Sequence, residues 1–143
     1  MKFTVAWIGK TKEPAIQSLT DEYLKRLARY ADVEGVAVKD ETALLKLQRG
    51  TRSTLVLLDG QGKQFSSEDL AKFLGDYQAR NPLPLLFAIG AADGFHDETR
   101  RAATTLLSLG RMTLAHELAR VVLLEQIYRA FTILKGHPYH LGH

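Results

Sequence analysis

Short apolar runs alternate with amphipathic stretches along the whole chain. Four of the apolar runs predict strands, at residues 3–8, 33–38, 53–59 and 83–90. A brief fifth strand is expected in the segment GRMTL at residues 110–114. The third strand is expected to stop at the segment DGQGK, because closely spaced Asp and Gly are typical of a tight turn.

Helical spacing of apolar residues predicts the elements between these strands. This spacing extends over residues 16–30, appears briefly around Leu44, and returns over residues 96–107. A serine at position 66 or 67 is expected to cap a further helix that reaches about Tyr77. Helices therefore follow most of the predicted strands.

This alternation predicts an α/β fold, a three-layer sandwich with a mainly parallel sheet. Strands separated by helices form parallel sheets, and strands that are apolar on both faces need helices on both sides. No repeat, linker or low-complexity segment interrupts the pattern, and 143 residues are enough for one core. We expect a single domain over residues 1–143.

The last predicted helix begins near His116 and ends before Gly136 and Pro138. Its apolar residues cover more than one stripe: Leu118, Val121, Val122, Leu123, Leu124, Ile127, Tyr128, Ala130, Phe131 and Leu134. Such a helix is either fully buried in its own domain or packed between its own sheet and a second subunit. The pattern leaves both interpretations open.

Composition narrows the cellular setting. The chain has no cysteine, which excludes disulfides and thiolate metal ligands. Its N-terminal apolar run is too short for a signal peptide or a membrane span, so we expect a cytoplasmic protein without a membrane partner.

Charge is modest and unevenly distributed. The net charge is +3, with ten Lys and Arg against seven Asp and Glu in residues 1–52 and nine of each in the remainder. Because affinity for nucleic acid grows with the number of phosphates neutralised, a role on RNA would need a shaped site or a dimer.

The loops that follow the strands are the main candidates for chemistry. Ligands of parallel α/β sheets bind beyond the carboxyl ends of the strands, where residues 58–60, 90–94 and 109–114 are expected. If these loops are neighbours, they form a pocket of small residues and main-chain amides that suits a flat base or a small cofactor. The segment GKT at residues 9–11 is not a phosphate loop, because Thr4 stands where that motif needs glycine.

The five histidines do not favour a metal site. His96 and His116 lie near predicted helix starts, where structural roles are expected. His137, His140 and His143 gather in the tail, but the Pro and Gly between them disfavour a regular element that would bring them together. We expect no bound metal.

Three segments carry a resemblance to a known family: VLLDGQGK, FAIGAADGF and LSLGRMTLAHELARVVLLEQIYRAFTILKGHPYH. Together with the N-terminal segment, they resemble the ribosomal RNA large-subunit pseudouridine N3-methyltransferases (RlmH type) of the SPOUT superfamily. The chain departs from the family pattern at Ala91, where a second glycine is usual, and at Ala115, where a proline is usual.

The resemblance implies a homodimer with a C-terminal trefoil knot. It also implies an enzyme that uses S-adenosylmethionine to methylate N3 of a pseudouridine of 23S rRNA and requires no metal. The ribosome would be its partner and substrate. Carried over by position, the cofactor site is expected to comprise Leu58, Gly90, Leu109, Gly110, Arg111, Met112, Thr113 and Leu114.

In this family the tail of one subunit reaches the active site of the other. We therefore expect Tyr139 and His140, supported by His137, to act on the target nucleotide, and His143 to be dispensable. The expected RNA contacts are Arg111, Arg129, Lys25, Arg26 and Arg29, although a solvated helix face explains the last three equally well. Two alternatives stay open: a SPOUT methyltransferase for a different RNA, and a non-catalytic dimeric protein that binds RNA or the ribosome.

Overall fold

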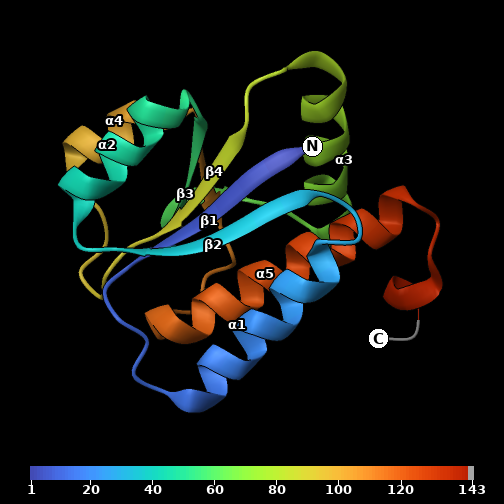
Figure 1. The fold of residues 1–143 in the computed structure, drawn as a ribbon, viewed down its shortest axis with the longest axis horizontal. Helices are drawn as coiled ribbons and strands as arrows, with labels where there is room; N and C mark the ends of the chain where they lie inside the picture. Colours follow the sequence, from blue (N-terminus) through green and yellow to red (C-terminus); the bar gives the residue numbers. More distant parts are fainter. Residues whose placement is uncertain (142–143) are drawn as a thin grey trace.

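The computed structural model describes residues 1–141, and for His140 the backbone alone (Figure 1). Its elements in chain order are β1 (Lys2–Ile8), α1 (Pro14–Leu27), β2 (Asp32–Val38), α2 (Glu41–Thr51), β3 (Thr54–Gln64), α3 (Ser67–Arg80), β4 (Leu85–Ile89), α4 (Asp97–Ala102), β5 (Thr105–Ser108), α5 (His116–Leu134) and the 3-10 helix η1 (Pro138–Leu141).

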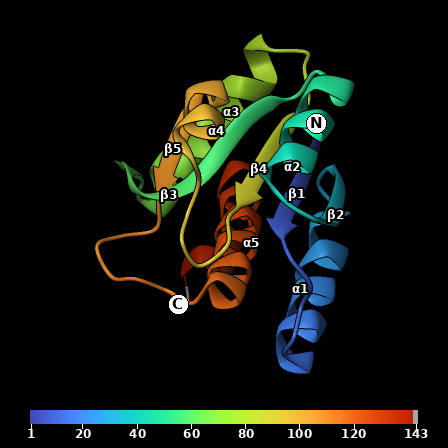
Figure 2. The same ribbon diagram turned by 90° about the vertical axis from the view of Figure 1, so that its left-hand side faces the viewer.

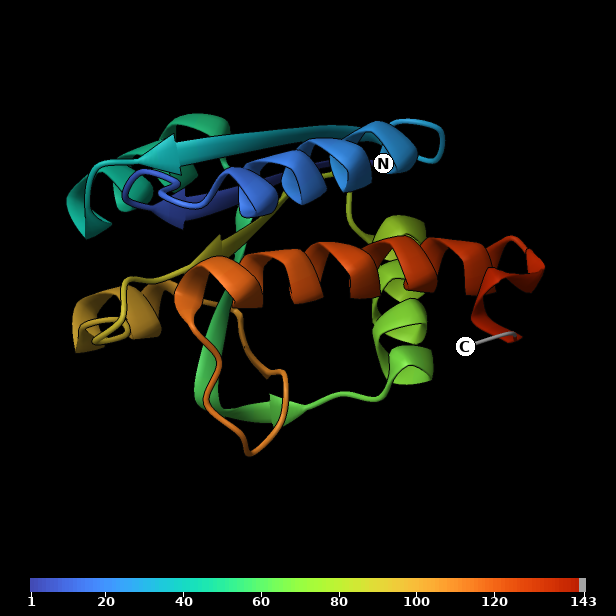
Figure 3. The same cartoon turned by 90° about the horizontal axis from the view of Figure 1, so that it is seen from below.

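The strands form one parallel sheet in the order β2-β1-β4-β3-β5. Helices α1, α3 and α5 cover one face, and α2 and α4 lie on the other (Figures 1 and 2). Figure 3 shows α1 and α5 running side by side along their face of the sheet. The predicted three-layer α/β sandwich is confirmed, and the trefoil knot stays a prediction.

The pleat of the central strands divides the core into two parts. Phe3, Val5 and Trp7 of β1 point toward α1 and α5, whereas Ala6 faces the smaller core under α2. The same alternation runs through β4, whose five residues are all buried. Apolar side chains on both faces explain why these strands read as continuous apolar runs.

Local sequence signals account for several element boundaries. Ser66 caps α3, because its Oγ accepts the Asp69 amide at 3.0 Å while Asp69 Oδ2 accepts the Ser66 amide. Gly136 has a φ of 70°, the left-handed conformation in which many helices end. Glycine adopts this conformation easily because it has no Cβ. The cap expected at position 66 or 67 and the stop after α5 are therefore confirmed.

The predicted fifth strand and the helix before it are wrong in position. Helix α4 ends at Ala102, β5 occupies Thr105–Ser108, and residues 110–114 form a loop. Leu106 and Leu107 pair with β3. A short buried strand has the same apolar spacing as the end of a helix, so periodicity alone does not separate the two.

The turn predicted at residues 59–63 is also wrong, because β3 continues to Gln64. Its pairing with β5 shifts register between Leu58 and Lys63, so the intervening residues bulge from the ladder. A Cβ at Gly62 would lie 2.5 Å from the backbone of Leu106. Glycine is needed here for close packing of two strands.

Candidate functional site

A cavity of about 350 Å³ lies beyond the carboxyl ends of β4 and β5 and against residues 58–60 in the middle of β3. Figure 2 shows the arrowheads of β1 and β4 pointing toward the side where the long loops run. The start of α5 closes the cavity on one side, through His116 and Ala119. We call this cavity the loop pocket, and its size is in the range of small-molecule sites.

The loop pocket gathers all eight positions expected to form the cofactor site: Leu58, Gly90, Leu109, Gly110, Arg111, Met112, Thr113 and Leu114. They come from three segments that are separated by up to about fifty residues in the chain. The sheet order brings the segments together, because β3 lies between β4 and β5. Sequence reasoning missed Ser108, His116 and Ala119, whose letters carry no motif signal.

Backbone conformation shapes the pocket wall after β5. Gly110 has a φ of 135°, which side chains on an L-residue rarely allow. The buried Ser108 Oγ accepts the Gly110 amide at 3.1 Å and donates to the Gly110 carbonyl at 3.0 Å. This turn fixes the direction in which residues 110–114 leave the sheet.

The wall after β4 is also built from small residues. A Cβ at Gly90 would lie 3.1 Å from the Phe95 ring, so this position leaves little room for a larger residue. Ala91, where the family usually has glycine, lines the pocket and is half-buried. Small residues at positions 90 and 91 therefore form this part of the wall.

A smaller polar hollow of about 270 Å³ adjoins the loop pocket and shares Leu58, Asp59, Gly60 and Gly94 with it. Arg100 Nε lies 3.1 Å from Asp59 Oδ2, and Arg100 Nη2 donates to Gln61 Oε1 at 3.1 Å. These contacts tie the bulge of β3 to α4.

Glu41 of α2 holds the loop after β4 from the opposite layer. Its carboxylate accepts the His96 amide at 2.9 Å and the Thr99 hydroxyl at 2.6 Å, and it lies 2.6 Å from His96 Nδ1. Burial acts to raise the pKa of Glu41, but the hydrogen bonds from Thr99 and His96 outweigh it, so the pKa is lowered. His96 itself is exposed, as expected for a structural residue at a helix start.

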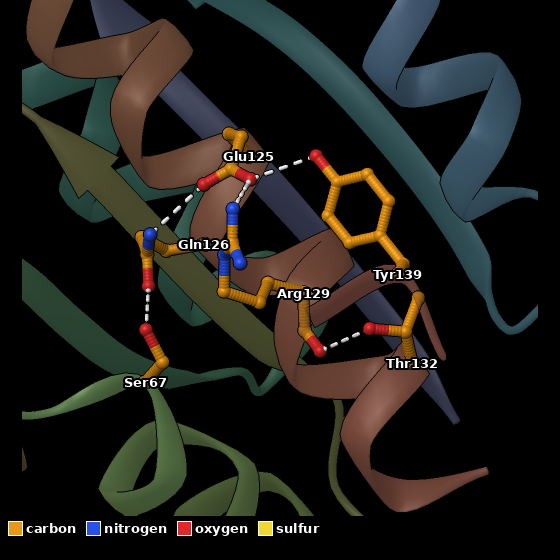
Figure 4. Close-up of polar contacts among 6 residues, drawn as sticks. All are labelled: Ser67, Glu125, Gln126, Arg129, Thr132 and Tyr139. Atoms are coloured by element: carbon orange, nitrogen blue, oxygen red, sulfur yellow. Dashed lines mark hydrogen bonds and ion pairs between the residues drawn. The ribbon is translucent and has the colours of Figure 1, made fainter. Parts of the chain in front are cut away.

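The tail folds back onto α5 of its own chain (Figure 4). Glu125 Oε2 accepts hydrogen bonds from Tyr139 Oη and Arg129 Nη2, both at 2.8 Å. The Arg129 guanidinium lies 5.1 Å from the centre of the Tyr139 ring, which also packs edge-on against Tyr128 at 4.8 Å. Gln126 links Glu125 to Ser67 of α3, with hydrogen bonds of 2.8 and 2.6 Å.

This arrangement keeps Tyr139 protonated. Burial, followed by the hydrogen bond to Glu125, raises the pKa of Tyr139 far above its ordinary value. In this arrangement the phenol donates its hydrogen bond to Glu125. His137 Nδ1 accepts the Tyr139 amide at 3.2 Å, which orients the turn that carries the phenol.

Within one chain the tail and the loop pocket are not brought together. Ala119 is the last residue of α5 that lines the pocket, whereas Tyr139 contacts Glu125, six residues or about 9 Å further along the helix. The backbone of His140 belongs to η1, and His143 lies outside the described residues.

The expected RNA-contacting cations fall in different environments. Arg111 is exposed at the pocket, and Lys25 and Arg29 are exposed on or just after α1. Arg129 is only 15% exposed and pairs with Glu125, so it does not present a free charge in this arrangement. Arg26 pairs with Glu22 at 2.9 Å and its guanidinium lies over the Tyr23 and Tyr128 rings.

Residues 1–141 contain neither a metal-binding cluster nor a membrane-spanning helix. No group of three or more His, Asp or Glu side chains in this part of the chain has an arrangement that could hold a metal ion. No helix among the same residues is long and apolar enough to cross a membrane.

Comparisons with known proteins identify the family. A family model described as "Predicted SPOUT methyltransferase" matches residues 1–140. The chain is 59% identical over 146 residues to the ribosomal RNA large subunit methyltransferase H of Koribacter versatilis, with both chains covered completely. It is 42% identical to the protein of that name from Geobacter sulfurreducens, with 98% of this chain and 99% of the relative covered.

Solved structures agree at the level of the fold. The SpoU methyltransferase AviRb from Streptomyces viridochromogenes, solved with AdoMet, matches with a TM-score of 0.59 and 16% identity over 95% of this chain and 59% of AviRb. Lpg2936 from Legionella pneumophila, solved with SAM, matches with a TM-score of 0.51 and 17% identity over 91% of this chain and 66% of its own. With the full-length relatives, these findings show that the chain belongs to the SPOUT methyltransferase family and, within it, to the ribosomal RNA large subunit methyltransferase H group.

Proposed function

We propose that the protein transfers a methyl group from S-adenosylmethionine to N3 of a pseudouridine in large-subunit (23S) ribosomal RNA on the assembled ribosome. The observation that carries this proposal is the gathering of all eight expected cofactor positions around one pocket. The relatives, which are named as ribosomal RNA methyltransferases, support the RNA substrate.

The loop pocket fits S-adenosylmethionine by size and chemistry. Its walls combine small residues with exposed apolar side chains, and Met112 is 87% exposed. Main-chain groups of residues 109–114 can hydrogen-bond an adenine edge, while Leu58 and Leu114 offer apolar contact. AviRb and Lpg2936 were solved with this cofactor, which supports the assignment.

When bound, the cofactor supplies the methyl group: the N3–C bond forms as the C–S bond breaks, leaving S-adenosylhomocysteine and a proton to be removed from N3. The protein has to hold the acceptor nitrogen in line with that bond, and such alignment can contribute about 7 to 11 kcal/mol at its limit. A positioned base adds about 10²- to 10⁴-fold.

The tail is proposed to supply residues for the acceptor side. Tyr139 is proposed to stack on the base, or to exchange its hydrogen bond to Glu125 for one to the base. A histidine, His140 or His137, is the candidate proton acceptor. Because the tail lies apart from the pocket of its own chain, the complete site is proposed to form between two subunits.

A homodimer is also supported by the surface of α5. Leu118, in the first turn of this helix, is 45% exposed, although most of the helix is buried. A partner packed against the start of α5 would cover Leu118 and bring a second tail toward the pocket. The modest net charge of +3 supports a preformed ribosomal surface over naked RNA as substrate.

The test is mass spectrometry of 23S rRNA from a strain that lacks the gene, with and without the gene restored. We expect one pseudouridine to lose a single methyl group and to regain it on complementation. Loss of a methyl group from another RNA would instead indicate a SPOUT methyltransferase that acts on that RNA. If calorimetry finds no cofactor binding at millimolar S-adenosylmethionine and no RNA changes, the non-catalytic alternative is correct.

A further inference from the structure

The segment joining β1 to α1, residues 9–13, lies beside the loop pocket. Trp7 of β1 pairs with Ile89 of β4, and Ile89 lines the pocket. The chain therefore leaves β1 next to the place where residues 90–94 leave β4. We call residues 9–13 the β1–α1 loop. It carries Lys10 and Lys12, both exposed, which belong to the basic excess of the first third of the chain.

Helix α5 attaches this loop to the pocket wall. Glu117 Oε1 accepts the amides of Lys12 and Glu13 at 3.0 and 3.3 Å, and Arg120 Nη1 donates to Thr11 Oγ1 at 2.8 Å. Glu117 and Arg120 alternate along α5 with His116 and Ala119, which line the pocket. Figures 1 and 3 show the starts of α1 and α5 close together.

Arg120 makes this attachment rigid. Its side chain is 1% exposed, its guanidinium lies 4.0 Å from the centre of the Trp7 ring, and it also reaches Thr20 Oγ1 at 3.4 Å. Burying a cation costs free energy unless polar or charged groups around it compensate for the lost water. The contacts it makes are to the loop, to α1 and to β1, so the loop is fixed relative to the sheet edge where the pocket opens.

The lysine side chains are left available by these contacts. The loop is held through backbone amides and the Thr11 hydroxyl, and neither ammonium group forms an ion pair with a carboxylate among residues 1–141. Two acidic groups lie nearby. Glu13 is exposed on the loop itself, and Glu117 is directed to the backbone amides and interacts with Arg120. Arg111 adds a third exposed cation on another wall of the pocket.

We propose that Lys10 and Lys12 bind phosphates of the RNA strand that flank the target nucleotide, with Glu117 and Arg120 as the residues that position them. The inference rests on the proposed function. A nucleotide whose base enters the loop pocket is joined on both sides to phosphodiesters, and these must pass the rim of the pocket. Cations on a fixed loop at that rim orient the strand without reading its sequence.

The experiment measures single-turnover methylation of ribosomes by Lys10→Gln, Lys12→Gln and the double variant, over a range of ribosome and salt concentrations. Lys46→Gln is the matched control, because Lys46 is exposed on α2 in the opposite layer. We expect each loop variant to raise the half-saturating ribosome concentration several-fold, with the maximal rate and the S-adenosylmethionine affinity unchanged. The slope of log affinity against log salt should fall by about 0.7 to 0.9 per lysine.

Two further variants separate the effect of the lysine charge from the effect of its position. Lys12→Arg keeps the cation and should behave as wild type, whereas Arg120→Met should raise the half-saturating ribosome concentration although both lysines remain. The proposal is overturned if the double variant matches Lys46→Gln in concentration and salt dependence, or if the loop variants change cofactor affinity alone.

Failure of the proposed function would look different. In that case the wild-type protein would transfer no methyl group to ribosomes at any concentration. Sedimentation of the variants with large ribosomal subunits would still test the lysines, because it measures binding without turnover. Equal binding by wild type and the double variant would overturn the inference.

Discussion

Individual residues around the loop pocket work by holding backbone in place. Glu41 ties the loop after β4 to α2, and Gly62 lets β3 and β5 approach closely. Neither touches the pocket, yet each controls a segment that forms its wall. Their effects belong to stability, which can be measured without any substrate.

Glu41→Gln should lower the free energy of unfolding by about 1 to 2 kcal/mol at pH 7, because Gln keeps the shape but loses the charged acceptor. The pKa of Glu41 is lowered from 4.5 in the folded protein, so its contribution is complete above that pH and is lost as the pH falls through the folded pKa. Urea unfolding between pH 7 and pH 3.5 should show the gap to wild type persisting at pH 5 and closing below about 4.5. A gap independent of pH would contradict this.

Gly62→Ala should destabilise the protein by about 1 to 3 kcal/mol, since its Cβ would meet the Leu106 backbone at 2.5 Å. Gly60→Ala is the matched control, because a Cβ there meets nothing within 4 Å. Chemical unfolding of both variants provides the measurement. Equal stability of the two would show that β5 moves away at little cost.

Among the elements, α5 connects the loop pocket to the tail, whose contact at Glu125 lies six residues or about 9 Å beyond Ala119, the last residue of the helix that lines the pocket. Its first turns hold the pocket and the β1–α1 loop, and its second half holds the tail through Glu125. The network from Ser67 through Gln126 to Glu125 also ties this half to α3 (Figure 4). The tail should therefore be separable from the cofactor site.

A chain that ends after Gly136 removes η1 and Tyr139 but none of the residues that line the loop pocket. We expect it to bind S-adenosylmethionine with wild-type affinity by calorimetry and to lose at least 10²-fold in single-turnover methylation. Tyr139→Phe, which keeps the ring but not the bond to Glu125, should lie between wild type and the truncated chain. Wild-type turnover by the truncated chain would exclude a role for the tail.

For the whole molecule, the separation of pocket and tail raises the question of whether one site is built from two subunits. In one chain the tail lies apart from the pocket, and Leu118 of α5 is exposed. We propose that a second copy covers Leu118 and contributes its tail to the site. Complementation between defective subunits tests this directly.

Thr113→Trp should fill the loop pocket of a chain with an intact tail, because Thr113 lies on an exposed loop that lines it. Mixed with the chain truncated after Gly136, it should restore methylation, since the heterodimer contains one sound pocket and one sound tail. Each protein alone should be inactive. Analytical ultracentrifugation checks that dimers form, and no recovery in a confirmed heterodimer would contradict a site shared between subunits.

Local spacing and side chains near in the chain were enough to predict the layered α/β architecture, the cap at Ser66 and the three segments that line the loop pocket. They were not enough to assign elements to all of these segments, because residues 58–60 lie inside β3 and residues 110–114 form a loop. The tertiary structure alone decided where β5 lies and why Gly62 is needed, because strand pairing overrides apolar spacing that fits both helix and strand. It also decided which loop Glu117 and Arg120 hold, and that Tyr139 meets Glu125. The contacts from Glu117 to the β1–α1 loop span 104 and 105 residues, and no local pattern records a partner at that distance. Only the packing of α5 beside α1 on one face of the sheet selects it.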